Sequence, residues 1–382
     1  MAGQAVARSV SSGVLSYGAM TFALATREDE PDVRRLLRDN ALGGAFGITL
    51  EREPDAFASD FGSSSNHAFI IARDTRSGQA AGLCERIVRQ AWVNGQARAL
   101  PYIGALRVAQ SHRRRIGVLR GGFQALRQLA ERPGELPFAL TSITADNAVA
   151  RRVLTAGVRG LPLYAPLGDF LTFAMRPERA RIADGIAAAT DADLPALAAF
   201  LQAQNAQFQF APMWSAADLR GLGRAGLPPG HFLIARQRGA IAGCIAVWDQ
   251  RAFRQTVIRR YPPWVFRLRH LANLVAPVLG LPGLPAPGSA LHQATLSHLA
   301  VAGEDTATFL ALVTAALDTA ARRGFGVAAL GFAQARGFHA PLLKARRALK
   351  YRTSLFLAHW PEHAAAVAAL DSRTPAPDPG LL

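Results

Sequence analysis

Cysteine is rare in this 382-residue chain, and the sequence signals of secreted or membrane-spanning proteins are missing. The two cysteines, Cys84 and Cys244, are too few for a disulfide framework, which favours a reducing cytoplasm. The first twenty residues lack the continuous apolar core of a secretory signal. No segment reaches the roughly 18 uninterrupted apolar residues of a membrane span, and no His or Cys spacing indicates a metal site. These absences favour a cytoplasmic protein without a metal.

Lysine is almost absent, so the formal net charge of +16 comes nearly all from arginine; the only lysines are Lys344 and Lys350. A basic chain favours anionic partners such as a phosphorylated cofactor, acyl carrier protein, nucleic acid or an anionic lipid surface. The abundance of Arg, Ala, Gly and Leu is also typical of a genomic base-composition bias. The charge therefore permits these partners without selecting one. Length and a 50% hydrophobic content favour two domains.

One stretch, Tyr102 to Ala130, has the order strand, basic loop, helix. Its apolar run ends at Val108, three consecutive arginines occupy 113–115, and a helix with one apolar face begins around Gly117. The first turn of a helix offers unpaired backbone N–H groups at the positive end of the helix dipole. Together with the arginines, this predicts a binding site for a pyrophosphate.

This stretch resembles the acetyl-CoA-binding segment of the GNAT (GCN5-related N-acetyltransferase) superfamily. In that family, a strand ending in Val is followed by Arg/Gln-x-x-Gly-x-Gly/Ala at the start of a helix. The glycine signature is incomplete here in either register. With Arg113 in the first position, Ile116 and Val118 replace both small residues; with Arg114 first, only Gly117 matches.

An internal repeat extends the resemblance over nearly the whole chain. The segment from Thr26 recurs from Thr190, and the hairpin from His67 recurs from His231. The repeat predicts an α/β (α+β) fold of two tandem GNAT-like domains, each a mixed, mostly antiparallel sheet flanked by helices. The predicted parts are a flexible lead-in (1–20), a domain with the CoA-binding loop (21–178), a degenerate domain (181–362) with an insertion at about 253–289, and a C-terminal tail (363–382).

The resemblance implies that acetyl-CoA, or a longer acyl-CoA, is the co-substrate of the first domain. The expected cofactor-binding residues are Leu106, Arg107, Val108, Arg113, Arg114, Arg115, Ile116, Gly117, Val118, Asn147 and Arg151. Backbone groups of Leu106 to Val108 would be freed where two strands splay apart, while Asn147 is alternatively a routine helix N-cap. In the second domain, Glu304 and Asp305 occupy the loop position and would repel a pyrophosphate.

The family's usual acid and base are not evident. Many members carry a Tyr that protonates the departing thiolate, but Val153 to Thr155 occupy that region. Tyr164 is the nearest phenol and is the predicted substitute, the alternative being a packed loop tyrosine. Glu85 is the predicted base, the alternative being a surface glutamate on a strand. The bound thioester is already activated, so positioning alone can supply much of the catalysis.

The insertion alternates aromatic residues (Tyr261, Trp264, Phe266) with cations. It could be an interfacial segment that meets lipid headgroups or an acyl chain. It could also be a lid over the acceptor site, or a segment that packs against the first domain and covers a sheet edge.

The main prediction is a cytoplasmic, bacterial-type N-acyltransferase, most simply an N-acetyltransferase, that transfers a non-aminoacyl group from CoA to a small-molecule or peptide amine. The neutral amine would attack a thioester carbonyl that backbone N–H groups polarise. One alternative is an aminoacyl-tRNA-dependent transferase of related fold. Another is a non-catalytic GNAT-like module that binds nucleic acid or an anionic membrane.

Overall fold

The computed structural model describes residues 10–11, 13–42, 46–58, 66–113 and 115–382. The strands up to residue 175 are β1 (Val10–Ser11), β2 (Val14–Tyr17), β3 (Met20–Leu24), β4 (Gly47–Glu51), β5 (Asn66–Asp74), β6 (Ala80–Val93), β7 (Gln96–Val108), β8 (Phe138–Thr144) and β9 (Leu163–Met175). Those that follow are β10 (Ile186–Ala188), β11 (Phe232–Gln237), β12 (Ala240–Trp248), β13 (Gln255–Arg260), β14 (Gln293–Val301), β15 (Val327–Ala333) and β16 (Leu349–His359). The α-helices are α1 (Glu30–Asp39), α2 (Ile116–Ala125), α3 (Ala148–Thr155), α4 (Leu194–Asn205), α5 (Ala216–Gly221), α6 (Pro263–Val275), α7 (Thr306–Arg322), α8 (His339–Ala345) and α9 (Ala364–Ala368).

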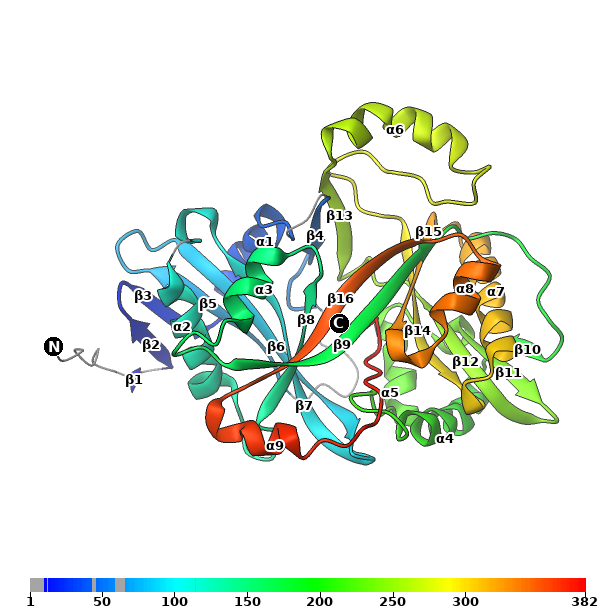
Figure 1. Ribbon diagram of the computed structural model, residues 1–382, viewed down its shortest axis with the longest axis horizontal. Helices are drawn as coiled ribbons and strands as arrows, with labels where there is room; N and C mark the ends of the chain where they lie inside the picture. The colour runs from blue at the N-terminus through cyan, green and yellow to red at the C-terminus, as the bar shows by residue number, and fades with distance from the viewer. Residues whose placement is uncertain (1–9, 12, 43–45, 59–65, 114) are drawn as a thin grey trace.

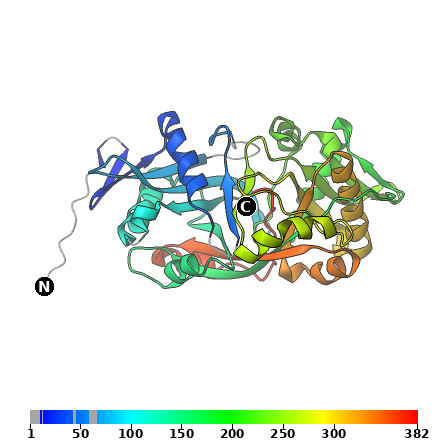
Figure 2. The same cartoon turned by 90° about the horizontal axis from the view of Figure 1, so that it is seen from above.

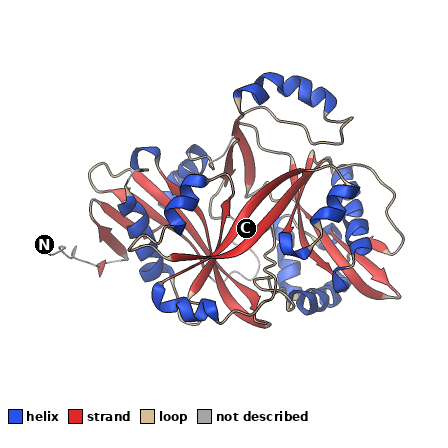
Figure 3. Ribbon diagram, viewed as in Figure 1, coloured by secondary structure: helices blue, strands red, loops and turns tan. Residues whose placement is uncertain are grey.

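A single sheet of 14 strands runs through the molecule (Figures 1 and 3). Its order is β1-β2-β3-β5-β6-β7-β8-β16-β9-β15-β14-β12-β11-β10. Neighbouring strands are antiparallel except for β7 with β8 and β14 with β15, which are parallel. Helices flank the sheet, which confirms the predicted fold class.

The two halves of the chain exchange their last strands. Strand β16 pairs with β8 of the first half, β9 pairs with β15 of the second, and β9 and β16 pair with each other. The halves therefore share one continuous sheet, and the boundaries at 21–178 and 181–362 stay a prediction. The predicted lead-in contains strand β2, which pairs with β3. The predicted tail folds back, and Ala376 N–H donates to Gln209 O at 2.8 Å.

The two helix starts that correspond in the sequence repeat have the same local geometry. Asp29 accepts a hydrogen bond from Thr26 N–H at 2.9 Å, and Asp193 accepts one from Thr190 N–H at 2.8 Å. Each carboxylate satisfies a backbone donor just before its helix, which is the reason for a Thr-x-x-Asp pattern at these places.

A second recurrence lies in the centre of each half. Ala105 on β7 and His298 on β14 both adopt left-handed backbone geometry, with φ of 48° and 53°, and each lies in a bulge of its own strand, where three steps along β7 or β14 oppose two along β6 or β12. Gly82 and Gly243 lie near these bulges, and a Cβ on either would meet a side chain of α2 or α7 within 3 Å. The two glycines allow each helix to approach its sheet closely.

Each half has helices on both faces of its sheet. In the first half, Ile70 packs with the α2 side of the sheet and Ile71 with the α1 side, as adjacent strand residues must. In the second half, α7 covers one face, while α4 and α5 cover the other. In each half, the central strands are therefore buried between helices on both faces.

The insertion is joined to the first half through a separate two-stranded sheet. Strand β13 pairs antiparallel with β4, from Gln255 opposite Glu51 to Arg260 opposite Gly47. Helix α6 then stands at the edge of the molecule (Figure 1). Within the described residues, no helix is both long and apolar enough to cross a membrane.

Candidate functional site

The parallel strands β7 and β8 separate soon after they meet. Within the described residues, their pairing covers only Tyr102 opposite Leu140 and Ile103 opposite Thr141. Beyond this point β7 continues on β6, where Arg107 lies opposite Leu83, while β8 continues on β16. Leu106, Arg107 and Val108 therefore lie in a V-shaped opening of the sheet, and their role in binding a cofactor stays a prediction.

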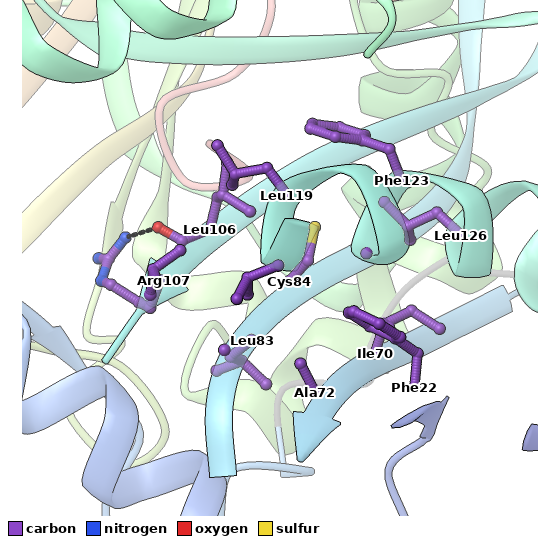
Figure 4. Close-up of a pocket in the computed structure, with 14 residues that line it drawn as sticks. Phe22, Ile70, Ala72, Leu83, Cys84, Leu106, Arg107, Leu119, Phe123 and Leu126 are labelled. Atoms are coloured by element: carbon purple, nitrogen blue, oxygen red, sulfur yellow. Dashed lines mark hydrogen bonds between the residues drawn. The ribbon is translucent and has the colours of Figure 1, made fainter. Parts of the chain in front are cut away.

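A small apolar cavity of about 20 Å³ lies between α2 and the strands beside this opening. Leu106, Cys84 and Phe123 are among the residues that line it (Figure 4). Burial raises the pKa of the Cys84 thiol to about 12, so this thiol is not a nucleophile at neutral pH. The Arg107 side chain points away from the cavity and donates to Leu106 O at 3.0 Å (Figure 4). Burial lowers the pKa of the Arg107 guanidinium to about 10.

The basic loop lies directly before α2. Arg115 is the N-cap residue, and its side chain makes no capping hydrogen bond. Ile116, Gly117 and Val118 form the first turn; Gly117 is half-exposed, whereas Val118 is buried against the sheet. The Val118 N–H donates to Arg115 O at 3.1 Å. The donors that suit an anion at the positive end of the helix dipole are therefore the N–H groups of Ile116 and Gly117. Arg114 lies outside the described residues.

The other two arginines of this loop already have partners. Arg115 lies 3.1 Å from Asp74, which also accepts from His112 at 3.1 Å, and Arg113 donates to Asn40 at 3.4 Å. The hydrogen bonds from His112 and backbone donors hold the pKa of Asp74 well below its ordinary value. A bound pyrophosphate would therefore compete with Asp74 for Arg115.

Helix α3 carries the last two predicted cofactor contacts. Asn147 is its N-cap, and the side-chain oxygen accepts from Ala150 N–H at 3.2 Å, which is the routine capping role. Arg151 is exposed on this helix. Arg120 of α2 donates to Arg159 O at 2.9 Å, so the segment after α3 lies beside α2.

The corresponding region of the second half is occupied by the chain itself. Asp305 caps α7 by accepting from Thr308 N–H at 2.8 Å, and Glu304 pairs with Arg336 at 2.5 Å. Strands β14 and β15 pair only from Gln293 to Leu296. Past that point the C-terminal segment enters, with Asp378 accepting from His298 N–H at 2.5 Å.

Glu85, the predicted base, lies at the centre of a buried charge cluster that contains Arg52, His67, Tyr102 and Arg254. Its carboxylate accepts two hydrogen bonds from Arg52, at 2.8 and 2.7 Å, and approaches His67 at 3.0 Å. Burial alone would raise the pKa of Glu85, but the charge of Arg52 and the contact with His67 outweigh it and lower the pKa. Burial, together with the neighbouring charge of Arg52, lowers the pKa of Arg254 to about 10.

Tyr164, the predicted acid, lies on the other face of the sheet. It packs in the same apolar cluster as Cys84 and Leu106, and its ring contacts Phe356 at a centroid distance of 6.0 Å. Burial raises its pKa, which keeps the phenol protonated at neutral pH. Cys84 and Glu85 are adjacent on β6 and point to opposite faces. The structure therefore brings Tyr164 and Glu85 to opposite sides of the opening.

The sequence matches no protein-family model, and no curated protein matches it significantly. Two structures of Saccharomyces cerevisiae N-myristoyltransferase share its architecture. One has bound myristoyl-CoA and inhibitors, a TM-score of 0.61 and 10% identity, and the match covers 97% of this chain and 87% of that one. The other has bound myristoyl-CoA, a TM-score of 0.58 and 12% identity, and covers 91% and 85%. The chain has the GNAT fold.

A GCN5-related N-acetyltransferase from Sphaerobacter thermophilus is also similar, with a TM-score of 0.49 and 14% identity over 89% of this chain and 95% of that one. The sequence did not indicate the roles of Arg52 and Arg254 near Glu85, because Glu85 lies far from both residues in the sequence. It also missed Asp74, the last residue of β5. No group of three or more His, Cys, Asp or Glu side chains that could hold a metal occurs among the described residues.

Proposed function

We propose that this protein is an acyl-CoA-dependent N-acyltransferase. The observation that carries the proposal is the open edge of β7 at Leu106 to Val108, next to the uncapped first turn of α2. Extended backbone donors suit the pantetheine arm and the thioester carbonyl, while the helix start suits the pyrophosphate. The yeast N-myristoyltransferase structures of the same fold hold myristoyl-CoA, which supports an acyl-CoA as the donor.

The reaction is direct transfer to an amine. A neutral amine attacks the thioester carbonyl, and backbone N–H groups of β7 stabilise the oxyanion that forms. The intermediate collapses by breaking the carbon–sulfur bond, which gives the amide and the CoA thiolate. The amine proton leaves on the Glu85 side of the sheet, and the thiolate gains a proton on the Tyr164 side.

An acetyl group is the donor that best fits the cavity. Its volume of about 20 Å³ is small, which favours a short acyl group over a long chain. A long acyl chain would need α2 to move away from the sheet, because Phe123 and Leu126 close the space. The acceptor, a small-molecule or peptide amine, approaches from the opposite face, where the buried charge cluster lies. We further propose a cytoplasmic location, since both cysteines are free and buried.

The test is product formation from acetyl-CoA in the presence of an amine panel, with release of free CoA thiol as the readout. We expect thiol release that depends on the amine and is faster with acetyl-CoA than with myristoyl-CoA. Glu85→Gln and Tyr164→Phe are the variants that test the two roles. Binding of tRNA that weakens with salt, without any binding of CoA, would instead favour an aminoacyl-tRNA-dependent transferase.

A further inference from the structure

Helix α6 presents a row of apolar side chains to solvent. Trp264, Leu268, Leu271 and Val275 recur at spacings of four, three and four residues, so they share one face of the helix. Their exposed fractions are 67%, 51%, 60% and 42%. Val265, about a quarter turn around the helix from this row, is buried in the small core of the insertion. The exposed row is thus additional to the face that holds the helix in place.

The exposed apolar surface extends beyond this row. Eight of the fifteen exposed large hydrophobic side chains of the described residues fall between positions 264 and 279. Single exposed apolar residues are ordinary, but so many on one short segment indicate an interaction surface. We call this group the α6 patch: Trp264, Phe266, Leu268, Leu271, Leu274, Val275, Val278 and Leu279.

The border of the α6 patch is basic. No Asp or Glu occurs between Asp249 and Glu304. Arg260 and Arg267 are exposed beside the patch. Arg347, also exposed, donates to the backbone oxygen of Leu279 at 3.3 Å, so the basic segment 344–352 adjoins the patch. Apolar side chains surrounded by arginine make up the composition of helices that lie in a membrane interface.

The α6 patch is held at one edge of the molecule. In Figure 1 the helix stands clear of the large sheet, and in Figure 2, seen from above, it lies on the side of the molecule that faces the viewer. The pairing of β13 with β4 fixes the base of the insertion. Within the insertion, the Tyr261 hydroxyl donates to Pro285 O at 2.9 Å, which ties the segment before α6 to the segment that returns after it. A rigidly held, protruding apolar surface can meet a flat partner.

We propose that the α6 patch docks the protein on an anionic lipid bilayer. The apolar row enters the boundary between headgroups and acyl chains, and the bordering arginines contact anionic headgroups. A second copy of this chain is disfavoured as the occupant, because it would bring two basic borders together. A free acyl chain is also disfavoured, because the patch is the convex side of a helix whereas ligand sites are concave.

The test is flotation of the full chain with two kinds of vesicle, phosphatidylcholine alone and phosphatidylcholine with about 30% phosphatidylglycerol. Leu271→Glu is the test variant. Val149→Glu is the matched control, because Val149 is also an exposed helical residue, at 75%, but lies on α3. We expect wild type and Val149→Glu to float with the anionic vesicles, less so at high salt, and Leu271→Glu to bind about tenfold more weakly or worse. Trp264 fluorescence should shift to shorter wavelength on the anionic vesicles, and Trp264→Phe should remove that shift.

Equal unfolding midpoints for Leu271→Glu and wild type would show that the variant is folded. The proposal is overturned if wild type does not float with anionic vesicles, or if Leu271→Glu floats as well as wild type. Equal binding of wild type to neutral and anionic vesicles would overturn the proposed contact of the arginines with anionic headgroups. A dimer in light scattering that Leu271→Glu dissociates would assign the patch to self-association instead.

Discussion

Replacing Glu85 with Gln should destabilise the protein strongly, because it leaves Arg52 charged and buried without its carboxylate. Both side chains are almost inaccessible, at 4% and 5% exposure, and two hydrogen bonds join them. Removal of one partner from a buried pair costs about 3 to 5 kcal/mol. Urea unfolding at pH 7 should therefore show a free energy of unfolding lower by that amount.

The pH dependence follows from the direction of the Glu85 pKa. The folded state lowers this pKa below the ordinary 4.5, so the ion pair stabilises the protein above that pH. The contribution is lost as the pH falls from about 4.5 towards the folded-state pKa. Glu85→Gln should remove this part of the acid sensitivity of wild type.

A double variant separates a structural role of Glu85 from a catalytic one. Arg52→Met with Glu85→Gln removes both charges, and should recover most of the lost stability. If Glu85 is the base, the double variant stays inactive although it is folded. A free energy of unfolding for Glu85→Gln within about 1 kcal/mol of wild type, which is the size of an exposed-pair effect, would refute the reasoning.

Three further predictions concern the opening and its surroundings. Gly117→Glu should weaken acetyl-CoA binding about 1000-fold, because a charge about 4 Å from the pyrophosphate costs roughly 4 kcal/mol. Gly230→Glu makes the same charge change at an exposed site of the second half and should leave the affinity unchanged. Equal affinities of the two variants in calorimetry would contradict this prediction. Cys84 and Cys244 should resist alkylation at pH 8 until the chain unfolds, because burial raises both thiol pKa values to about 12. Rapid labelling of either cysteine in the folded protein, detected by mass spectrometry, would contradict this prediction. Phe123→Ala should enlarge the cavity beside α2 and shift the thiol-release rate towards longer acyl-CoAs; an unchanged chain-length profile would argue that the acyl group lies elsewhere.

Much of the fold could be predicted because its signals are local. The recurrence of the segment from Thr26 at Thr190 indicated two similar helix starts, and Thr26 and Thr190 are both N-cap residues in the structure. The order of elements was enough to predict a mixed, mostly antiparallel sheet. It could not predict that β9 and β16 change places, since both strands carry similar apolar patterns and the choice depends on packing between distant segments.

The candidate site was predictable only in part. The strand edge at Leu106 to Val108 followed from a local motif, and those residues lie in the opening. The partners of its charged groups did not follow, because Arg52 and Arg254 approach Glu85 from segments far away in the sequence. The entry of Asp378 into the second half had no sequence signal either, because a Pro-rich tail shows no periodicity.

The most direct test is calorimetric titration of acetyl-CoA into the full chain. The proposed site in the first half, together with the occupied opening of the second, predicts one equivalent bound per chain, and Gly117→Glu should weaken this binding about 1000-fold. No binding of acetyl-CoA or of longer acyl-CoAs would contradict the acyltransferase proposal. Two equivalents would contradict the assignment of the cofactor to the first half alone.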